Sequence, residues 1–293
     1  MTRSESARLS AFASVPVRPV RGRIAGLAAT WWEAGPVQGR PLVLVHGGGA
    51  DEARLSWGRL IGPLAAAGHR VLAVDLPGYG LTESLRITHS IEDLADFLID
   101  FCLTTDLDRP ALCGISMGGG TVLSAALRRR GLARAVVAVA PYGLLGASPH
   151  PRLFWLAARL PLHRAAFALV AASERIAHRS TARLFADPAR IDADLVPQVR
   201  EAAARQARRP AFAAFARGEM LRSGFRTDLA PRLHEIDVRA TLIHGEGDPL
   251  IPAAASLRAA RDAGLPCELL PGGHLLPRER PDETLDAIVR AIA

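Results

Sequence analysis

The sequence predicts an α/β fold in which a mostly parallel sheet is covered on both faces by helices. Two observations lead to this expectation. Short apolar runs rich in Val, Leu and Ile recur along the 293 residues, and helical patterns lie between them. Hydrophobic residues make up 49% of the chain, which is typical of a globular core.

Six segments have the length and composition of strands buried on both faces. Each is short, continuously apolar and bounded by turn residues, as expected for parallel strands under helices. They are residues 41–46, 69–75, 111–115, 135–140, 240–244 and 266–270. The earlier segment 17–33 predicts an antiparallel pair at one edge, with Gly22 and Gly26 as turn residues.

Five helices are predicted between these strands. The best defined follows Ser90, because Ser90 and Asp93 have the spacing of a capping box and the apolar residues after them fall on one face. The expected helices are residues 55–67, 90–103, 118–130, 252–263 and 282–292.

A long segment separates two of the predicted strands. About 100 residues lie between the strand ending near Ala140 and the strand starting near Ala240, whereas a simple connection needs only about two to six. The pattern in this segment is helical, and prolines interrupt it repeatedly. We therefore expect an inserted helical lid.

The charge of the chain is concentrated in this segment. The sequence has a formal net charge of +7 and contains no lysine, and residues 141–224 hold 13 arginines against 6 acidic residues. Alanine is also abundant, so the arginine content indicates a coding bias rather than selection for phosphate contacts. We expect no nucleic-acid partner. For the lid arginines we favour solvated helix faces, with binding of an anionic substrate as the alternative.

A serine lies between two glycines directly after one of the predicted strands. In Gly114-Ile115-Ser116-Met117-Gly118 this serine occupies a tight turn from the strand into a helix. Such a turn lifts the hydroxyl clear of the sheet and points the helix amino terminus at whatever the serine attacks. Because the pattern is short and common, a nucleophilic serine also requires a base, an acid and an oxyanion hole elsewhere in the chain.

His274 is the strongest of the nine histidines as the general base. It ends a Gly-Gly-His loop after the last predicted strand, so its side chain can project from the carboxyl edge of the sheet beside Ser116. An imidazole titrates near neutral pH, which suits a base for a serine hydroxyl. His46 and His244 also end strands, but their glycine-rich surroundings favour structural roles.

Asp248 is the best candidate for the acid that orients this histidine. It lies in the turn after strand 240–244, and the order Ser116, Asp248, His274 is that of one lineage of catalytic triads. Glu246, in the same turn, is its rival. Asp75 precedes a Leu-Pro-Gly-Tyr-Gly turn and is expected to bind loop amides instead.

Backbone amides near the serine are expected to form the oxyanion hole. The three glycines after His46 let the chain approach closely, and we assign one donor to Gly48 and the other to Met117. A phosphate cradle is disfavoured because no Gly-Lys-Ser/Thr sequence follows. The three cysteines lack the paired spacing of a zinc site. We expect neither a metal nor a cofactor.

Together, these motifs resemble those of the α/β-hydrolase superfamily over nearly the whole chain. The resemblance implies an α/β-hydrolase fold, with a mostly parallel sheet of about eight strands and a lid inserted after the sixth. The core would comprise residues 1–140 and 225–293, and the helical lid (cap) residues 141–224. The signatures that carry the resemblance are residues 46–49, 75–80, 114–118, 245–248, and 273–274 followed by 279–281.

Several activities within the superfamily remain open. The triple glycine and residues 116–119 look like the meta-cleavage-product hydrolases, which cut carbon–carbon bonds. Those enzymes usually have Asn before the nucleophile and Trp after the catalytic histidine, where this chain has Ile115 and Leu275. Enol-lactonases and carboxylesterases fit equally well. Ser116 argues against haloalkane dehalogenases and epoxide hydrolases, which use an aspartate nucleophile.

We therefore predict a carboxylesterase-like serine hydrolase that cleaves an ester, lactone, thioester or activated carbon–carbon bond of a small organic substrate through an acyl-enzyme on Ser116. The alternatives are a ligand-binding or sensor protein on the same fold, and an acyltransferase or perhydrolase with the same triad. The first residues lack the apolar run of a signal peptide and no segment is long enough to span a membrane, so we expect a cytoplasmic protein without a membrane partner. The oligomeric state is open, and a homodimer is one option.

Overall fold

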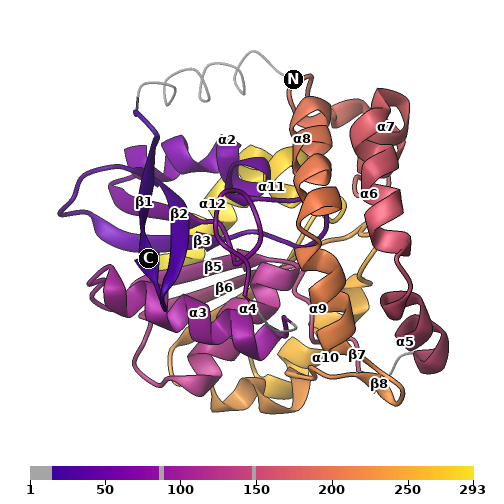
Figure 1. Cartoon of the computed structure of the whole chain (residues 1–293). Coiled ribbons are helices and arrows are strands. Elements are labelled where there is room, and N and C mark those ends of the chain that lie inside the picture. The colour runs from indigo at the N-terminus through magenta and orange to yellow at the C-terminus, as the bar shows by residue number, and fades with distance from the viewer. Residues whose placement is uncertain (1–14, 86–88, 147–149) are drawn as a thin grey trace.

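The computed structural model describes residues 15–85, 89–146 and 150–293, and its architecture confirms the predicted α/β-hydrolase fold (Figure 1). Residues 1–14, which include most of the segment used to argue against a signal peptide, lie outside the described residues. The strands of the main sheet are β1 (Arg18–Ile24), β2 (Leu27–Ala34), β3 (Arg40–Val45), β4 (His69–Val74), β5 (Ala111–Ile115), β6 (Ala135–Val139), β9 (Arg239–Gly245) and β10 (Cys267–Leu270).

The sheet has eight strands in the order β1-β2-β4-β3-β5-β6-β9-β10. The six strands from β4 to β10 are parallel, and β1 and β2 form an antiparallel pair at one edge. These six are the predicted apolar segments, with ends that differ by no more than one residue. The carboxyl ends of the parallel strands therefore meet at one edge, where the loops after β3, β5, β9 and β10 lie together.

The predicted helices are also present, with ends displaced by at most two residues. Two layers of helices cover the sheet, and consecutive strand residues pack on opposite sides because their side chains alternate. The core helices are α2 (Ala53–Ala66), α3 (Ile91–Thr104), α4 (Met117–Arg128), α10 (Ala253–Ala263), α11 (Leu276–Glu279) and α12 (Pro281–Ile292). Val43 and Val45 join the core under α3, α4 and α10, whereas Leu42 and Leu44 join the core under α2 and α12.

The β1–β2 hairpin corrects one detail of the sequence analysis. Ala25 and Gly26 form its turn with φ of 49° and 81°, a backbone that matches the twist of two-residue hairpins. Gly22 is not a turn residue, because it lies inside β1 opposite Ala29. A Cβ atom there would lie 3.0 Å from the Trp31 ring, so close packing explains this glycine.

Most of the remaining chain is inserted between β6 and β9. We refer to residues 141–224, of which 147–149 lie outside the described residues, as the insertion. Figure 1 shows its helices standing together at one side of the sheet. Its elements are α5 (Pro151–Arg159), α6 (Leu162–Ala172), α7 (Glu174–Ala182), the turn η1 (Pro188–Arg190), α8 (Leu195–Arg208), α9 (Ala211–Glu219), β7 (Met220–Leu221) and the start of β8 (Gly224–Phe225), and the turn η2 (Ala230–Glu235) follows.

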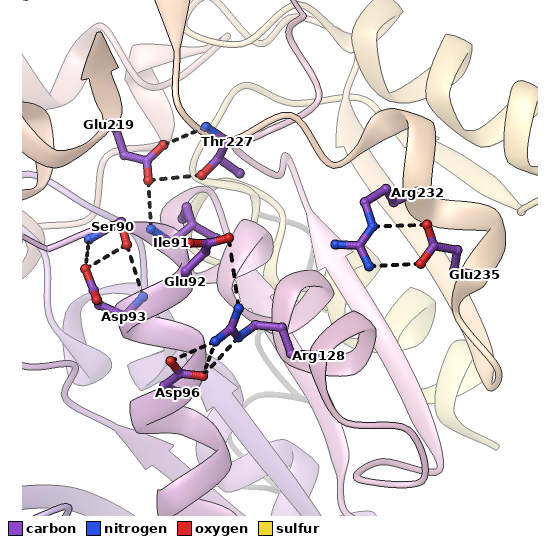
Figure 2. A network of polar contacts seen from close by, with 10 residues as sticks. All are labelled: Ser90, Ile91, Glu92, Asp93, Asp96, Arg128, Glu219, Thr227, Arg232 and Glu235. Carbon is purple, nitrogen blue, oxygen red and sulfur yellow. Dashed lines mark hydrogen bonds and ion pairs between the residues drawn. The ribbon is translucent and has the colours of Figure 1, made fainter.

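A buried glutamate fastens the end of the insertion to the core (Figure 2). Glu219, the last residue of α9, accepts hydrogen bonds from the amide of Ile91 at 2.8 Å and from the hydroxyl of Thr227 at 3.0 Å. Ile91 begins α3, where Ser90 and Asp93 form the predicted capping box. The carboxylate thus satisfies a free amide at a helix amino terminus, and this links the insertion to α3.

Candidate active site

Ser116 lies on a strained turn between β5 and α4. Its backbone has φ of 55° and ψ of −118°, a conformation that is rare for a residue with a side chain. Its amide donates to the Val139 carbonyl at 2.9 Å, and its carbonyl accepts from the Tyr142 amide at 2.9 Å. Helix α4 begins at the next residue, Met117, so the free amides of its first turn lie beside the serine.

The glycines around this serine permit a very close approach of backbones. A Cβ atom on Gly114 would overlap the carbonyl oxygen of Gly118, and one on Gly118 would overlap the carbonyl oxygens of Val45 and His46. The turn therefore packs directly on the end of β3, which brings the glycine loop after His46 next to Ser116. A Cβ atom on Gly47 would lie 3.3 Å from the Cβ of Ser116.

His274 and Asp248 are joined by a short hydrogen bond. His274 Nδ1 donates to Asp248 Oδ2 at 2.7 Å, and the other carboxylate oxygen accepts from the amides of Leu250 at 2.8 Å and Ile251 at 2.9 Å. Burial alone would raise the pKa of Asp248, but hydrogen bonds from His244 and His274, the charge of His274 and the Ile251 amide together hold that pKa well below its usual range. The carboxylate is thus ionised at neutral pH.

His244, which is fully buried, also contacts the Asp248 carboxylate. Its Nε2 lies 2.9 Å from the Ile251 carbonyl oxygen and 3.1 Å from Asp248 Oδ2, and its Nδ1 lies 2.8 Å from the Ser256 hydroxyl. Because both neighbours of Nε2 only accept, that nitrogen carries the proton and Nδ1 accepts from Ser256. The expected structural role of His244 thus includes holding Asp248. Glu246, the rival acid, is exposed, and none of its atoms bonds to a histidine in the part of the chain that the structure describes.

Within the described residues, the glycine loop after His46 presents one free amide, that of Gly48. The Gly47 amide donates to Asp51 Oδ2 at 2.8 Å, and the Gly49 amide bonds to the Tyr79 hydroxyl. Among the described residues, no acceptor is recorded for the amide of Gly48. The Tyr79 hydroxyl also donates to Met117 Sδ at 3.8 Å, so this buried tyrosine links the two segments that carry the expected oxyanion donors.

Asp51 organises this loop, although nothing in the sequence alone singles it out. Its carboxylate accepts from the Gly47 amide, from the Glu52 amide at 2.8 Å and from the Ser56 hydroxyl at 2.6 Å. Burial raises its pKa to about 6, against the opposing effect of these hydrogen bonds. The only sequence signal is an acid just before α2, and many helices begin that way without a catalytic neighbour.

The structure supports structural roles for the other two candidates near this loop. His46 Nδ1 donates to the Gly47 carbonyl at 2.7 Å, and its Nε2 accepts from the Leu76 amide at 3.0 Å. Asp75 accepts from the amide of Ala53 at 3.0 Å and more weakly from that of a loop residue, Leu81, at 3.5 Å. Both side chains are buried, and each ties together the loops that surround the serine.

The Glu279 carboxylate holds the loop that carries His274. It is buried and accepts from the amides of Gly273 at 2.7 Å and Asp187 at 2.9 Å. The His274 amide itself donates to the Leu184 carbonyl at 2.7 Å. Since Leu184 and Asp187 belong to the insertion, the position of His274 depends on the insertion as well as on the core.

Ser116, His274, Gly48 and Met117 all line one cavity of about 500 Å³. No hydrogen bond joins Ser116 Oγ to His274 among the described residues. The other walls are largely apolar and come from the insertion and the core; they include Phe154, Phe167, Phe212, Phe215, Phe225, Ile115 and Leu275.

The arginines of the insertion do not reach this cavity. No arginine lies among its described lining residues, and Asp51 is the one acidic side chain there. The sequence-based alternative of an anionic substrate bound by lid arginines therefore receives no support from the described cavity lining. Among the described residues, no cluster of three or more His, Cys, Asp or Glu side chains is arranged to hold a metal ion.

Comparison with known proteins identifies the family. Residues 42–287 match the alpha/beta hydrolase family. The chain belongs to this family.

Individual relatives are more distant. The chain is 34% identical to a 2-hydroxy-6-oxo-6-(2'-aminophenyl)hexa-2,4-dienoic acid hydrolase of Metapseudomonas resinovorans, over 41% of each protein. That match spans less than half the length of the relative. The chain is also 29% identical to the uncharacterized hydrolase YugF of Bacillus subtilis, over 82% of this α/β hydrolase and 85% of that protein.

The fold of this α/β hydrolase is also found in solved structures. The enol-lactonase from Burkholderia xenovorans LB400 superposes with a TM-score of 0.76 at 21% identity, covering 93% of this chain and 99% of that one. At this level of identity the likeness shows the fold alone.

Proposed function

We propose that this α/β hydrolase is a serine esterase that cleaves neutral, apolar esters through an acyl-enzyme on Ser116. One observation carries the proposal. Ser116 and His274 line the same cavity, and Nδ1 of His274 is hydrogen-bonded to Asp248. A nucleophile, a base and an orienting acid are the parts that acyl transfer needs.

The proposed reaction follows from the protonation states. Asp248 accepts a hydrogen bond from the Nδ1–H group of His274 and keeps the proton on that nitrogen. Nε2 is therefore unprotonated and can accept the Ser116 hydroxyl proton after the serine side chain rotates toward it. The serine oxygen attacks the ester carbonyl, and its carbonyl oxygen becomes an oxyanion. The imidazolium then gives its proton to the leaving alkoxide, which departs as the alcohol. Water, deprotonated by His274, repeats the attack and releases the carboxylic acid.

The oxyanion is assigned to the amides of Gly48 and Met117. Gly48 is favoured within the glycine loop because the amides on either side are engaged by Asp51 and Tyr79. The Met117 amide opens α4, where the helix dipole adds to the stabilisation of negative charge. Losing one such donor typically costs about 3 kcal/mol of transition-state stabilisation.

A neutral substrate is favoured by the charge of the cavity. A carboxylate inside it would be desolvated without a cationic partner and would face Asp51, which has a pKa of about 6 and is mostly ionised at pH 7.5. The dienoic acid named for the Metapseudomonas relative carries such a group. Ile115 and Leu275 add apolar surface on either side of the candidate nucleophile and base, so an ester is favoured over a dienoate carbon–carbon bond.

We propose that the insertion, residues 141–224, is a lid over this site. It supplies most of the phenylalanines that line the cavity, and its Leu184 holds the amide of His274. Removal of water by such a cover would strengthen the interactions that stabilise charge in the transition state.

Turnover of p-nitrophenyl esters of increasing acyl length tests the proposal. We expect hydrolysis by the wild type, with a preference for acyl chains that fill the cavity, and a loss of roughly a thousandfold or more in kcat for Ser116→Ala. If ester binding persisted without turnover in either protein, a ligand-binding function on this fold would replace the esterase.

A further inference from the structure

Helices α5 and α6 present apolar side chains to the outside of the molecule. Figure 1 shows them at the outer side of the insertion, with α8 between α6 and the sheet. Five leucines on these helices and the turn between them are 44–62% exposed: Leu153, Leu156, Leu160, Leu162 and Leu169. Leu153, Leu156 and Leu160 share one helical face, as do Leu162 and Leu169. We call these five residues the outer leucine face.

Such a surface is unusual for helices on a protein in water. Helix α6 contains no buried residue at all, and α5 buries only Ala158. No single helix among the described residues has the length and apolar composition to cross a membrane, but α5 and α6, bent by 67°, meet that test together. A strongly exposed apolar face of this kind marks a surface that another apolar phase covers.

The charged side chains of α5 and α6 are all positive. Residues 151–172 include Arg152, Arg159 and Arg164, and contain no Asp or Glu. All three arginines are exposed, and none pairs with an acidic side chain in the described part of the chain. Leucines flanked by unpaired arginines form the pattern of helices that lie in the interface of an anionic bilayer, where the arginine stems cover apolar surface and the head groups meet phosphates.

The same helices continue inward to the cavity. Phe154 is 43% exposed and also lines the cavity, and Phe167 of α6 lines it as well. The helices that carry the outer leucine face therefore also supply part of the cavity wall.

We propose that the outer leucine face docks on an anionic lipid surface. A second copy of this chain is the less favoured occupant, because a twofold interface would bring together two surfaces whose own charged side chains are all positive. The sequence predicts no membrane partner, because it contains no segment long enough to span a membrane. Docking of this kind requires none, since the helices would lie in the interface plane.

Co-sedimentation with vesicles tests this inference independently of catalysis. Ser116→Ala protein is mixed with vesicles of phosphatidylcholine alone, or of phosphatidylcholine and phosphatidylglycerol in equal parts. We expect binding to the anionic vesicles that weakens with added salt, and at least about tenfold weaker binding for the triple variant Leu153→Gln, Leu156→Gln, Leu169→Gln. The matched control carries Leu81→Gln, Leu103→Gln and Leu257→Gln, which are exposed leucines outside the insertion, and should bind like its parent.

A second variant guards against effects on folding. Arg152→Gln with Arg164→Gln keeps the apolar face and should reduce both the binding to anionic vesicles and its salt dependence. The inference is overturned if the parent protein sediments with neither vesicle, or if the leucine triple variant, with an unchanged thermal unfolding curve, binds as well as its parent. It is also overturned if the parent protein binds no vesicles and light scattering shows that it is a dimer whereas the leucine triple variant is a monomer.

Discussion

Asp248 Oδ2 lies 2.7 Å from Nδ1 of His274, although 26 residues separate the two in the sequence. The same oxygen is approached by the protonated Nε2 of His244 at 3.1 Å. The carboxylate is thus oriented by two imidazoles and by two backbone amides, and it fixes the tautomer that leaves His274 Nε2 able to accept a proton.

Replacing this carboxylate should disable the base without unfolding the protein. In Asp248→Asn, the side-chain NH2 group would occupy the Oδ2 position, because the backbone amides of Leu250 and Ile251 require an oxygen at the Oδ1 position. It would then donate to His274 Nδ1 and move the histidine proton to Nε2. We expect kcat for ester hydrolysis to fall by about a thousandfold or more. Asp262→Asn, at an exposed position of α10, is the control, and a loss of less than tenfold in Asp248→Asn would contradict the assignment.

Asp51 should act on the reaction through the position of the glycine loop. Asp51→Ala frees the Gly47 amide, so the Gly48 amide loses its fixed direction, and we expect kcat to fall roughly ten- to a hundredfold with little change in KM. Ser56→Ala removes one hydrogen bond to the same carboxylate and leaves the Gly47 contact intact. It should cost much less, and equal losses in the two variants would argue against a positioning role.

The charge preference of the cavity can be measured with paired esters of equal size. We expect kcat/KM for a neutral ester to exceed that for its anionic partner by at least about tenfold at pH 7.5, since an unpaired buried carboxylate is costly. Leu250 lines the cavity and is more than half exposed, so Leu250→Arg can place a hydrated guanidinium at the cavity wall. In that variant, the ratio of kcat/KM for the neutral ester to kcat/KM for the anionic ester should be smaller than in the wild type. A wild-type preference for the anion would contradict the proposed substrate class.

His46 should make stability fall at mildly acidic pH. Burial lowers its pKa from 6.5 to about 4, so the unfolded chain binds a proton before the folded chain does as the pH falls through this range. The contribution of His46 to the free energy of unfolding should decline by about 3 kcal/mol between pH 7 and pH 4.

The comparison with His46→Gln isolates this effect. Asp51 and Asp75 act in the opposite sense, because burial raises their pKa values to about 6 and about 7 and the folded chain therefore gains their protons first. Urea unfolding of both proteins at each pH gives the difference in free energy of unfolding. We expect that difference to shrink as the pH falls, and a constant difference would refute the assignment to His46.

The sequence predicts the fold well wherever an element is determined by a local pattern of residues. The six parallel strands follow from apolar runs, and the capping box at Ser90 follows from spacing alone. Gly22 was misread because a glycine inside a strand and a glycine in a turn look alike until the Trp31 ring is placed over it.

Contacts between segments that are far apart in the sequence could not be predicted from it. Asp51 bonds to the glycine loop, Tyr79 bridges that loop to Met117, and Glu279 holds the histidine loop against the insertion. Each depends on tertiary packing that no local pattern encodes. The absence of the insertion's arginines from the described cavity lining is equally non-local, because it depends on which face of each helix packs inward.

Covalent labelling with a fluorophosphonate probe tests the central claim most directly, because the probe reacts with an activated serine and mimics the tetrahedral intermediate. Intact mass and peptide mapping should show a single adduct on Ser116 in the wild type and none in Ser116→Ala. An unlabelled wild-type protein, or equal labelling of Ser116→Ala, would contradict the assignment of Ser116 as the nucleophile.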